Sequence, residues 1–137
     1  MKSEKHQSNA TMLPGMELSD DSLLSFDLPK LIRMLKFGNS WKSGELCSTV
    51  LLKNPDKKIV LAAIPEGTEI TSNKSDEPII LQIIEGSLML KTRKEKRSLI
   101  KGHLHILDEN TRFLLASKEE TVLLITVPAN AMAAEYN

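Results

Sequence analysis

The stretch that decides the fold is GTEITSNKSDEPIILQIIEG, which runs from Gly67 to Gly86. It opens with a glycine, continues through a polar turn, and then holds a nearly continuous apolar run that ends at Glu85. An apolar run of this length is typical of a β-strand that is buried on both faces. Neither histidine nor cysteine occurs between the two glycines. The segment therefore predicts a central strand without the nitrogen and sulfur ligands that transition metals prefer in proteins.

Further short strands are predicted on both sides of this run. Apolar segments of strand length alternate with turn residues in ELCSTVLLK, KKIVLAAI, SLMLKT, RSLIK, HLHIL, RFLLA and TVLLITV. About nine strands at spacings of roughly 8–12 residues indicate an all-β sandwich or barrel. Upstream, FDLPKLIRMLKFGN predicts one short helix, since apolar residues recur at helical spacing from Leu28 and Asp27 provides a start signal. We expect this helix to act as a packing lid.

The 137 residues are enough for one domain with a single core. We expect residues 1–24, which are polar and irregular, to form a flexible N-terminal arm. Residues 25–128 hold the strands and form the predicted barrel, and residues 129–137 form a C-terminal tail. The tail has weak helix propensity, so we expect it to fray.

Charge and cysteine content narrow the classes of function. The chain has 18 basic and 18 acidic residues, so no overall field favours nucleic acid or an anionic membrane surface. No apolar run approaches the roughly 20 residues that span a bilayer. Cys47 is the only cysteine, which excludes an internal disulfide and is typical of a cytoplasmic protein. Because Cys47 lies in a strand segment, we expect it to be packed or half-buried rather than reactive.

A set of short features recurs in a characteristic order along residues 26–127. The features are STVLLKNPD, LAAIPEGTEI, QIIEG, LIKGH, ILDEN and ASKEETVLLITV. In this order and with these intervals the chain resembles a small single-domain cupin of the RmlC-like jelly-roll superfamily. The resemblance implies an all-β cupin-type double-stranded β-helix, a jelly-roll barrel, with one short N-terminal helix. It also implies a homodimer, because cupin-like barrels commonly pair their edge strands.

The resemblance also identifies the positions at which a cupin holds a metal. In the first cupin motif, the two histidine positions are held by Asn73 and Ser75 and the carboxylate position by Ile79. The histidine position of the second motif is held by Phe113. An amide and an alcohol are poor ligands for iron, manganese, nickel or zinc, and hydrocarbon side chains are none. The comparison of motifs therefore predicts a degenerate cupin that binds no metal and no other cofactor.

A ligand pocket inside the barrel is the remaining candidate site. The resemblance implies that it is lined near Asn73, Ser75, Gln82 and Phe113, with Ile79 as a wall. The same side chains could instead fill the barrel, because burial of a large apolar residue contributes roughly 1.5–3 kcal/mol. We favour a filled or narrowed interior over an open site, and we assign no catalytic residue.

Two other segments offer rival sites. His103 and His105 lie two apart in GHLHIL, but a metal site needs further ligands and His6 lies in the predicted arm. We therefore expect a surface or hydrogen-bonded histidine pair. The basic segment KTRKEKRSLIK, residues 91–101, could bind phosphates. It lacks interleaved aromatic residues, so a solvated hairpin tip is the better interpretation and no nucleic-acid partner is predicted.

These observations favour a metal-free, non-catalytic barrel that binds a small molecule or acts as a dimeric interaction module in the cytoplasm. The expected partners are a second copy of the chain and a small ligand, with neither nucleic acid nor membrane involved. The alternative is a cupin-type metal-dependent isomerase, dioxygenase or lyase whose site has moved to His103 and His105.

Overall fold

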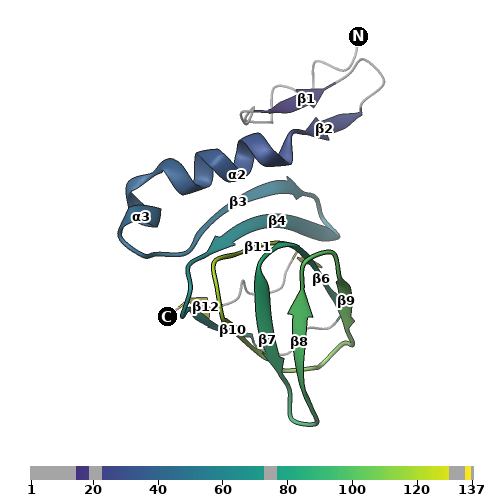
Figure 1. Cartoon of the computed structure of the whole chain (residues 1–137). Coiled ribbons are helices and arrows are strands. Elements are labelled where there is room, and N and C mark those ends of the chain that lie inside the picture. Colours follow the sequence, from purple (N-terminus) through teal and green to yellow (C-terminus); the bar gives the residue numbers. More distant parts are fainter. Residues whose placement is uncertain (1–14, 19–22, 73–76, 130–134, 137) are drawn as a thin grey trace.

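The structure, a computed structural model, describes residues 15–18, 23–72, 77–129 and 135–136. Figure 1 shows two sheets that form the body of the molecule and a helix that lies along one side of it. The first sheet has the strand order β3 (Cys47–Lys53), β4 (Lys57–Ile64), β11 (Thr121–Pro128), β6 (Ile79–Glu85) and β9 (Leu104–Leu107). The second sheet has the order β12 (Glu135–Tyr136), β5 (Glu69–Thr71), β10 (Leu114–Ser117), β7 (Ser87–Lys91) and β8 (Lys96–Ile100). This antiparallel arrangement confirms the predicted all-β jelly-roll architecture.

The decisive apolar run forms β6, which lies between β11 and β9 in the first sheet. Ile79, Leu81 and Ile83 are buried on one face of the strand, because successive side chains of a strand point to opposite faces. On the other face Gln82 is exposed, so the strand is fully covered on one face only. Gly86 follows the strand with a φ of 83° and begins the turn into β7.

The space between the two sheets is lined by hydrocarbon side chains. Both sheets contribute side chains to this core. Every second side chain of a strand points inward, because successive side chains lie on opposite faces of the strand. The buried members of this interior core are Ala62, Ile64, Ile70, Ile79, Leu81, Ile83, Leu88, Leu90, Leu99, Leu107, Phe113, Leu115 and Leu123. A core of this kind stabilises the fold by about 25 cal/mol for each Å² of apolar surface that it removes from water.

One helix, α2 (Leu28–Phe37), covers the outer face of the first sheet (Figure 1). It begins at Asp27, whose Oδ1 accepts a hydrogen bond from the backbone N–H of Lys30 at 3.1 Å. The helix and the outward side chains of the sheet form a second core, the lid cluster. Its buried members are Leu31, Ile32, Leu61, Ala63 and Val122. The predicted helix and its role as a packing lid are therefore confirmed.

The N-terminal region differs from its prediction as a wholly irregular arm, residues 1–24. Two short strands, β1 (Met16–Leu18) and β2 (Leu24–Phe26), pair with each other in a separate antiparallel sheet next to α2. The rest of the predicted arm, residues 1–14 and 19–22, lies outside the described residues. Strands of three residues are too short to produce an alternating sequence signal, which is why their pairing was not predicted.

The same physical reason explains three further elements that the sequence did not predict. In the C-terminal tail, residues 129–137, β12 pairs with β5 and adds an edge to the second sheet, whereas the tail was expected to fray. The strand β5 itself lies in a segment interpreted as a turn. A four-residue helix, α3 (Asn39–Lys42), follows α2. Each of these elements spans two to four residues and depends on its neighbours in space rather than on its own sequence pattern.

Candidate functional site

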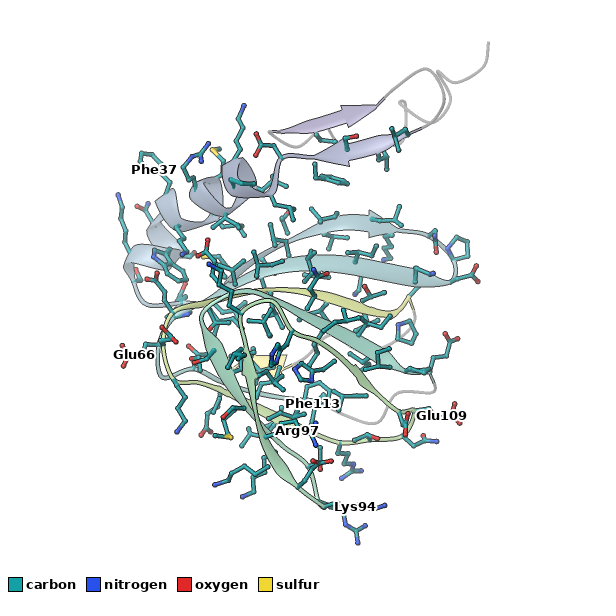
Figure 2. All side chains as sticks on the ribbon, turned by 45° about the vertical axis from the view of Figure 1, so that its right-hand side comes forward. Phe37, Glu66, Lys94, Arg97, Glu109 and Phe113 are labelled. Carbon is teal, nitrogen blue, oxygen red and sulfur yellow. The ribbon has the colours of Figure 1, made fainter. Side chains whose placement is uncertain are left out.

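Two of the residues predicted to line a ligand pocket lie in the interior core. Ile79 begins β6 in the first sheet, and Phe113 precedes β10 in the second sheet; both are buried (Figure 2 labels Phe113). They belong to the same cluster of contacting hydrocarbon side chains, so the fold brings them into one interior. Of the three other predicted lining residues, Asn73 and Ser75 lie outside the described residues, and Gln82 lies elsewhere on β6.

The structure corrects the prediction that Gln82 lines the interior. Gln82 is exposed and stands opposite Leu104 on β9 and Leu124 on β11, on the outer face of the first sheet. Ile79, three residues earlier in the same strand, faces inward. Because side chains alternate along a strand, two residues separated by three positions point to opposite faces.

Two polar atoms are buried without a hydrogen-bond partner among the described residues, namely Ser72 Oγ and His105 Nε2. Ser72 follows β5, and its backbone N–H donates to the carbonyl of Phe113 at 3.1 Å, which places both side chains on the inner face of the second sheet. His105 stands opposite Leu81 in the pairing of β9 with β6, so its imidazole turns toward the interior as well. Buried polar atoms in native proteins nearly always have a partner, such as a water molecule or a ligand.

The imidazole of His105 lies near the side chains of His103 and Arg97. Its ring centroid is 5.6 Å from that of His103, and the two ring planes are tilted by 59°. Arg97 on β8 stands opposite the buried Leu90, on the inward-facing side of that strand (labelled in Figure 2). Burial lowers the pKa of His105 below its ordinary value of 6.5, and electrostatic repulsion from the neighbouring His103 and Arg97 lowers it further. His105 is therefore neutral at pH 7, and each of its ring nitrogens is either a donor or an acceptor.

These positions differ from the expected surface or hydrogen-bonded histidine pair. His103 is exposed, as expected, but His105 is only half-exposed and its Nε2 is buried without a partner in the described part of the chain. The sequence shows that both residues share a face of the strand, but only the register with β6 decides that this face is the inner one. Sequence reasoning missed Ser72 altogether, although the two-residue period from Ile70 would have indicated it.

A pH dependence of stability follows from the lowered pKa of His105. Below about pH 6.5 the unfolded chain binds a proton at this imidazole more tightly than the folded chain, so the fold loses stability as the pH falls through that value toward the folded-state pKa. We expect thermal unfolding midpoints to fall more steeply between about pH 7 and pH 5 in the wild type than in His105→Asn. The matched variant His103→Asn should keep most of the wild-type slope. An NMR titration of His105 with a midpoint at or above 6.5 would contradict this assignment.

The residues present do not fit the metal site that the resemblance implies. Ile79 and Phe113 offer hydrocarbon at two of its positions. Within the described ranges, no group of three or more His, Cys, Asp or Glu side chains is placed to hold a metal ion. Neutral imidazole is a suitable metal ligand, but the pair of His103 and His105 supplies only two nitrogen donors, fewer than a stable site requires.

The other sequence candidates have structural explanations. Cys47 is half-buried, and its thiol Sγ donates to the carbonyl of Glu45 at 3.6 Å. Burial, and to a smaller extent the charge of Glu45, raises the pKa of Cys47, which keeps the thiol protonated and confirms the expectation of a packed cysteine. The basic segment forms the β7–β8 hairpin, whose tip closes where the N–H of Thr92 donates to the carbonyl of Glu95 at 2.8 Å. In the described residues, no helix is long and apolar enough to cross a membrane.

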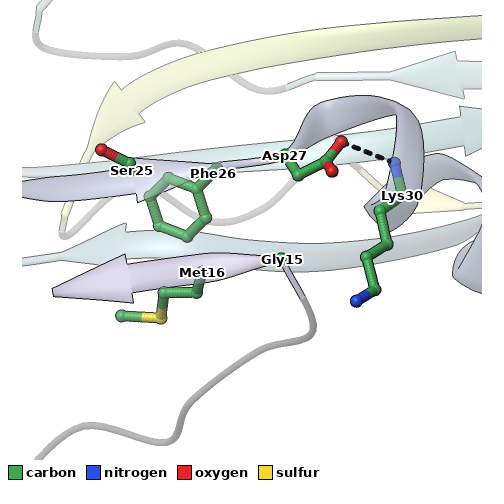
Figure 3. Close-up of a pocket in the computed structure, with 6 residues that line it drawn as sticks. All are labelled: Gly15, Met16, Ser25, Phe26, Asp27 and Lys30. Carbon is green, nitrogen blue, oxygen red and sulfur yellow. Dashed lines mark hydrogen bonds between the residues drawn. The ribbon is translucent and has the colours of Figure 1, made fainter.

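An open pocket lies between the β1–β2 sheet and the start of α2 (Figure 3). Its lining residues are Gly15, Met16, Ser25, Phe26, Asp27 and Lys30. The carboxylate of Asp27 accepts the capping hydrogen bond of α2, drawn as a dashed line in Figure 3. None of these residues belongs to the interior core. Helix capping and the packing of the small sheet therefore account for this pocket.

Comparisons with known proteins agree with the architecture. The sequence matches no family model, and no curated protein sequence matches it significantly. A cupin-2 domain protein from Shewanella frigidimarina is 18% identical, with a TM-score of 0.61 over 75% of this chain and 93% of that chain. A cupin superfamily protein from Desulfitobacterium hafniense is 14% identical, with a TM-score of 0.60 over 63% of this chain and 79% of that chain.

A larger protein shares the fold over nearly the whole length of this chain. A variant of salicylate 1,2-dioxygenase from Pseudoaminobacter salicylatoxidans is 14% identical, with a TM-score of 0.69 over 94% of this chain and 43% of that chain. At these identities the comparisons concern the arrangement of the strands and not the chemistry of the site. Together with the order of the strands in the two sheets, they show that this chain has the cupin fold.

Proposed function

We propose that this chain is a metal-free, non-catalytic cupin-fold protein that binds a small, mainly apolar, uncharged molecule in its interior. The observation that carries the proposal is the pair of buried polar atoms without partners, Ser72 Oγ and His105 Nε2. A buried polar atom that lacks a hydrogen bond destabilises a protein by about 1–3 kcal/mol. A ligand that forms hydrogen bonds with these two atoms removes this loss of stability. Such a ligand should therefore bind more tightly than one that only contacts the hydrocarbon lining.

The chemistry of the surrounding residues indicates the class of ligand. The interior core consists of Ala, Ile, Leu and Phe side chains, which favour a hydrocarbon body of the ligand. Among the described residues, the buried polar side chains are Ser117 and Thr121, and no buried charge is present to pair with an ionic ligand. Ser72 can donate or accept a hydrogen bond, and neutral His105 can do either through Nε2. A hydroxyl or carbonyl group on an apolar body therefore matches the site.

Three small probes separate this proposal from simple apolar binding. Phenol can donate to the imidazole, cyclohexanone can accept from the serine hydroxyl, and toluene can do neither. We expect phenol or cyclohexanone to bind about fivefold more tightly than toluene, which corresponds to one neutral hydrogen bond. Chemical-shift titrations that follow the methyl groups of the interior core measure the three affinities in the wild type and in each variant. In His105→Leu the preference for phenol should disappear, whereas the exposed-site variant Gln82→Ala should retain it. Equal affinities for phenol and toluene in the wild type would contradict the proposal.

A pair of matched serine substitutions tests the same site without any ligand. Ser72→Ala removes a buried hydroxyl that has no partner in the described residues, so we expect the free energy of unfolding to stay equal or to rise by up to about 1–3 kcal/mol. Ser117→Ala is the control, because the buried Ser117 Oγ donates to the carbonyl of Pro65 at 2.6 Å and accepts from the N–H of Thr68 at 2.8 Å. The free energy of unfolding of Ser117→Ala should fall by about 1–3 kcal/mol. Urea denaturation compares the two, and equal losses would show that Ser72 has a partner after all.

A second candidate function, a metal-dependent enzyme with a relocated site, is favoured by one observation. His103 and His105 face the same side of the chain with ring centroids 5.6 Å apart, and His105 is turned toward the interior. Calorimetric titration with Zn²⁺, Ni²⁺, Mn²⁺ and Fe²⁺ distinguishes the two functions. If the protein is metal-free, none of these ions should bind tightly in a 1:1 ratio. An ion that binds in this ratio to the wild type but not to His105→Asn would support the enzyme instead.

A further inference from the structure

The outer side of α2 carries apolar side chains that neither core of the fold uses. Leu31 and Ile32 are buried against the first sheet, and the helical repeat places Met34 and Phe37 on the side away from it. Met34 is 51% exposed, and Phe37, at 76%, is the most exposed large apolar side chain of the described residues. Figure 2 shows Phe37 at the helix and turned away from the two sheets. The helix therefore presents hydrocarbon to the surroundings as well as to the sheet.

Basic side chains surround this apolar pair. Residues 28–44, which include α2 and α3, contain four basic and no acidic residues. Lys30 and Arg33 are exposed and precede Phe37 by seven and four positions, which places them on the same side of the helix. Nζ of Lys42 lies 5.4 Å from the centre of the Phe37 ring. The α2 outer surface is the set formed by Lys30, Arg33, Met34, Phe37 and Lys42.

The positive charge of the α2 outer surface is not neutralised within the described part of the chain. The fourth basic residue, Lys36, lies on the flank of the helix, where its Nζ is 3.2 Å from Oε1 of Glu120 and 3.6 Å from Oε1 of Glu85. The three basic residues of the outer surface form no ion pair with any described residue. The expectation that no membrane is involved rested on the charge of the whole chain, which the fold distributes unevenly.

We propose that the α2 outer surface binds the surface of an anionic lipid membrane. Lysine and arginine side chains are attracted to anionic headgroups, and an aromatic ring beside them is stabilised when it enters the boundary between headgroups and acyl chains. The α2 outer surface combines the two kinds of side chain on one side of a helix. This proposal does not depend on whether the barrel interior binds a ligand.

The shape of the surface favours lipid over an acidic segment of another protein. The helix lies on the outside of the first sheet, so its outer side projects from the molecule (Figure 1). A projecting phenylalanine can enter a lipid surface directly, because lipids rearrange around it. A protein partner would have to provide a pocket of matching shape for the ring in addition to its acidic side chains.

The small number of contacting side chains predicts a weak and reversible attachment. Each lysine or arginine near an anionic surface strengthens binding about fivefold. We therefore expect the full chain to sediment with vesicles that contain about 30% phosphatidylserine in phosphatidylcholine, and to bind vesicles of phosphatidylcholine alone at least about tenfold more weakly. At about 1 M salt, where charges are screened beyond roughly 3 Å, most of this preference should disappear. Equal binding to both kinds of vesicle at low salt, or no binding to either, would overturn the proposal.

A matched pair of charge reversals locates the contact. Arg33→Glu reverses one charge of the α2 outer surface, and we expect it to weaken binding to the anionic vesicles at least about tenfold. Lys94→Glu makes the same change at the exposed tip of the β7–β8 hairpin, labelled in Figure 2, and should stay within about twofold of the wild type. Circular dichroism shows whether both variants are folded. An equal loss in both variants, or a loss only in Lys94→Glu, would mean that α2 does not make the contact.

Two substitutions of Phe37 test whether its ring enters the lipid. Phe37→Ser should weaken vesicle binding about tenfold, because the apolar ring no longer leaves water. Phe37→Trp provides a fluorescent ring at the same position, and the half-buried Trp41, the only tryptophan of the wild type, gives the background. With lipids brominated near the headgroup end of the acyl chains, we expect at least about twice the fractional quenching in Phe37→Trp as in the wild type. Equal quenching would show that the ring stays in water and would contradict the proposal.

Poly-L-glutamate distinguishes an acidic protein segment from lipid as the partner. The polymer offers carboxylates without an apolar layer, so we expect it to bind at least about tenfold more weakly than the anionic vesicles and without any dependence on Phe37. If the polymer binds to the wild type, fails to bind to both Arg33→Glu and Phe37→Ser, and the vesicles do not bind at all, the partner is an acidic segment of a protein and the lipid proposal is wrong.

Discussion

Replacing Gly86 with alanine is expected to destabilise the protein by on the order of 3 kcal/mol or more. Gly86 has a φ of 83°, a conformation that is unfavourable by about 1–2 kcal/mol for residues with a Cβ atom. An added Cβ would also overlap the backbone carbonyl of Glu120 and would lie 2.8 Å from Cα of Thr121. Both atoms belong to the main chain at the start of β11, and forced overlap of this kind adds about 1–3 kcal/mol. Urea denaturation with the linear extrapolation measures the sum.

A second glycine separates the two contributions. Gly67 has the same φ of 83°, but an added Cβ would meet no atom within 4 Å. We expect Gly67→Ala to lose only the conformational part, about 1–2 kcal/mol. If Gly67→Ala and Gly86→Ala lost the same free energy, the close approach of the β6–β7 turn to β11 would have no energetic effect.

Replacing Leu81 with alanine is expected to lose about 2–5 kcal/mol of unfolding free energy. Leu81 is 0% exposed at the centre of β6 and belongs to the interior core between the two sheets. It stands opposite His105 on β9 and Ile125 on β11, so neighbouring strands on both sides contact the space that the substitution empties. The side chains around it are held by the sheets and cannot collapse fully, which keeps the loss in the upper part of the range. Urea denaturation again provides the measurement.

The neighbouring residue provides the control for this variant. Gln82→Ala changes the next position of the same strand, where the side chain is exposed on the outer face. We expect a change of less than about 0.5 kcal/mol. A large loss in Gln82→Ala would mean that the outer face of β6 is covered in solution, for example by another molecule.

The sequence predicted the parts of the fold that have long, regular signals. The helix was predictable because Asp27 provides its cap and its apolar residues recur at helical spacing. The apolar run of β6 was predictable because it is bounded by turn residues at both ends. By contrast, β5 and β12 span only three and two residues, and their pairing with each other joins parts of the chain far apart in sequence. No local pattern indicates such a pairing.

The candidate site was predicted less completely, for a reason that lies in strand geometry. Motif spacing placed both Ile79 and Gln82 at the interior, although their separation by three residues excludes this within one strand. The two-residue spacing of His103 and His105 shows that they share one face of their strand. Whether that face points into or out of the barrel depends on the register with β6. Ser72 was not predicted as a site residue because the short strand β5, which it follows, was not predicted either. These are long-range properties that emerge only when the strands are assembled.

The position of α2 has a consequence for how this protein can change over time. The strands β4 and β11 separate two compartments, with Ala62 and Leu123 facing the barrel interior and Ala63 and Val122 facing the helix. Each of these residues packs in one of the two cores only, so a substitution there changes that core and leaves the other unaltered. Selection can therefore change the side chains of the interior core to suit a different ligand while the lid cluster keeps its packing. Equally, the lid cluster can change while the interior core stays the same.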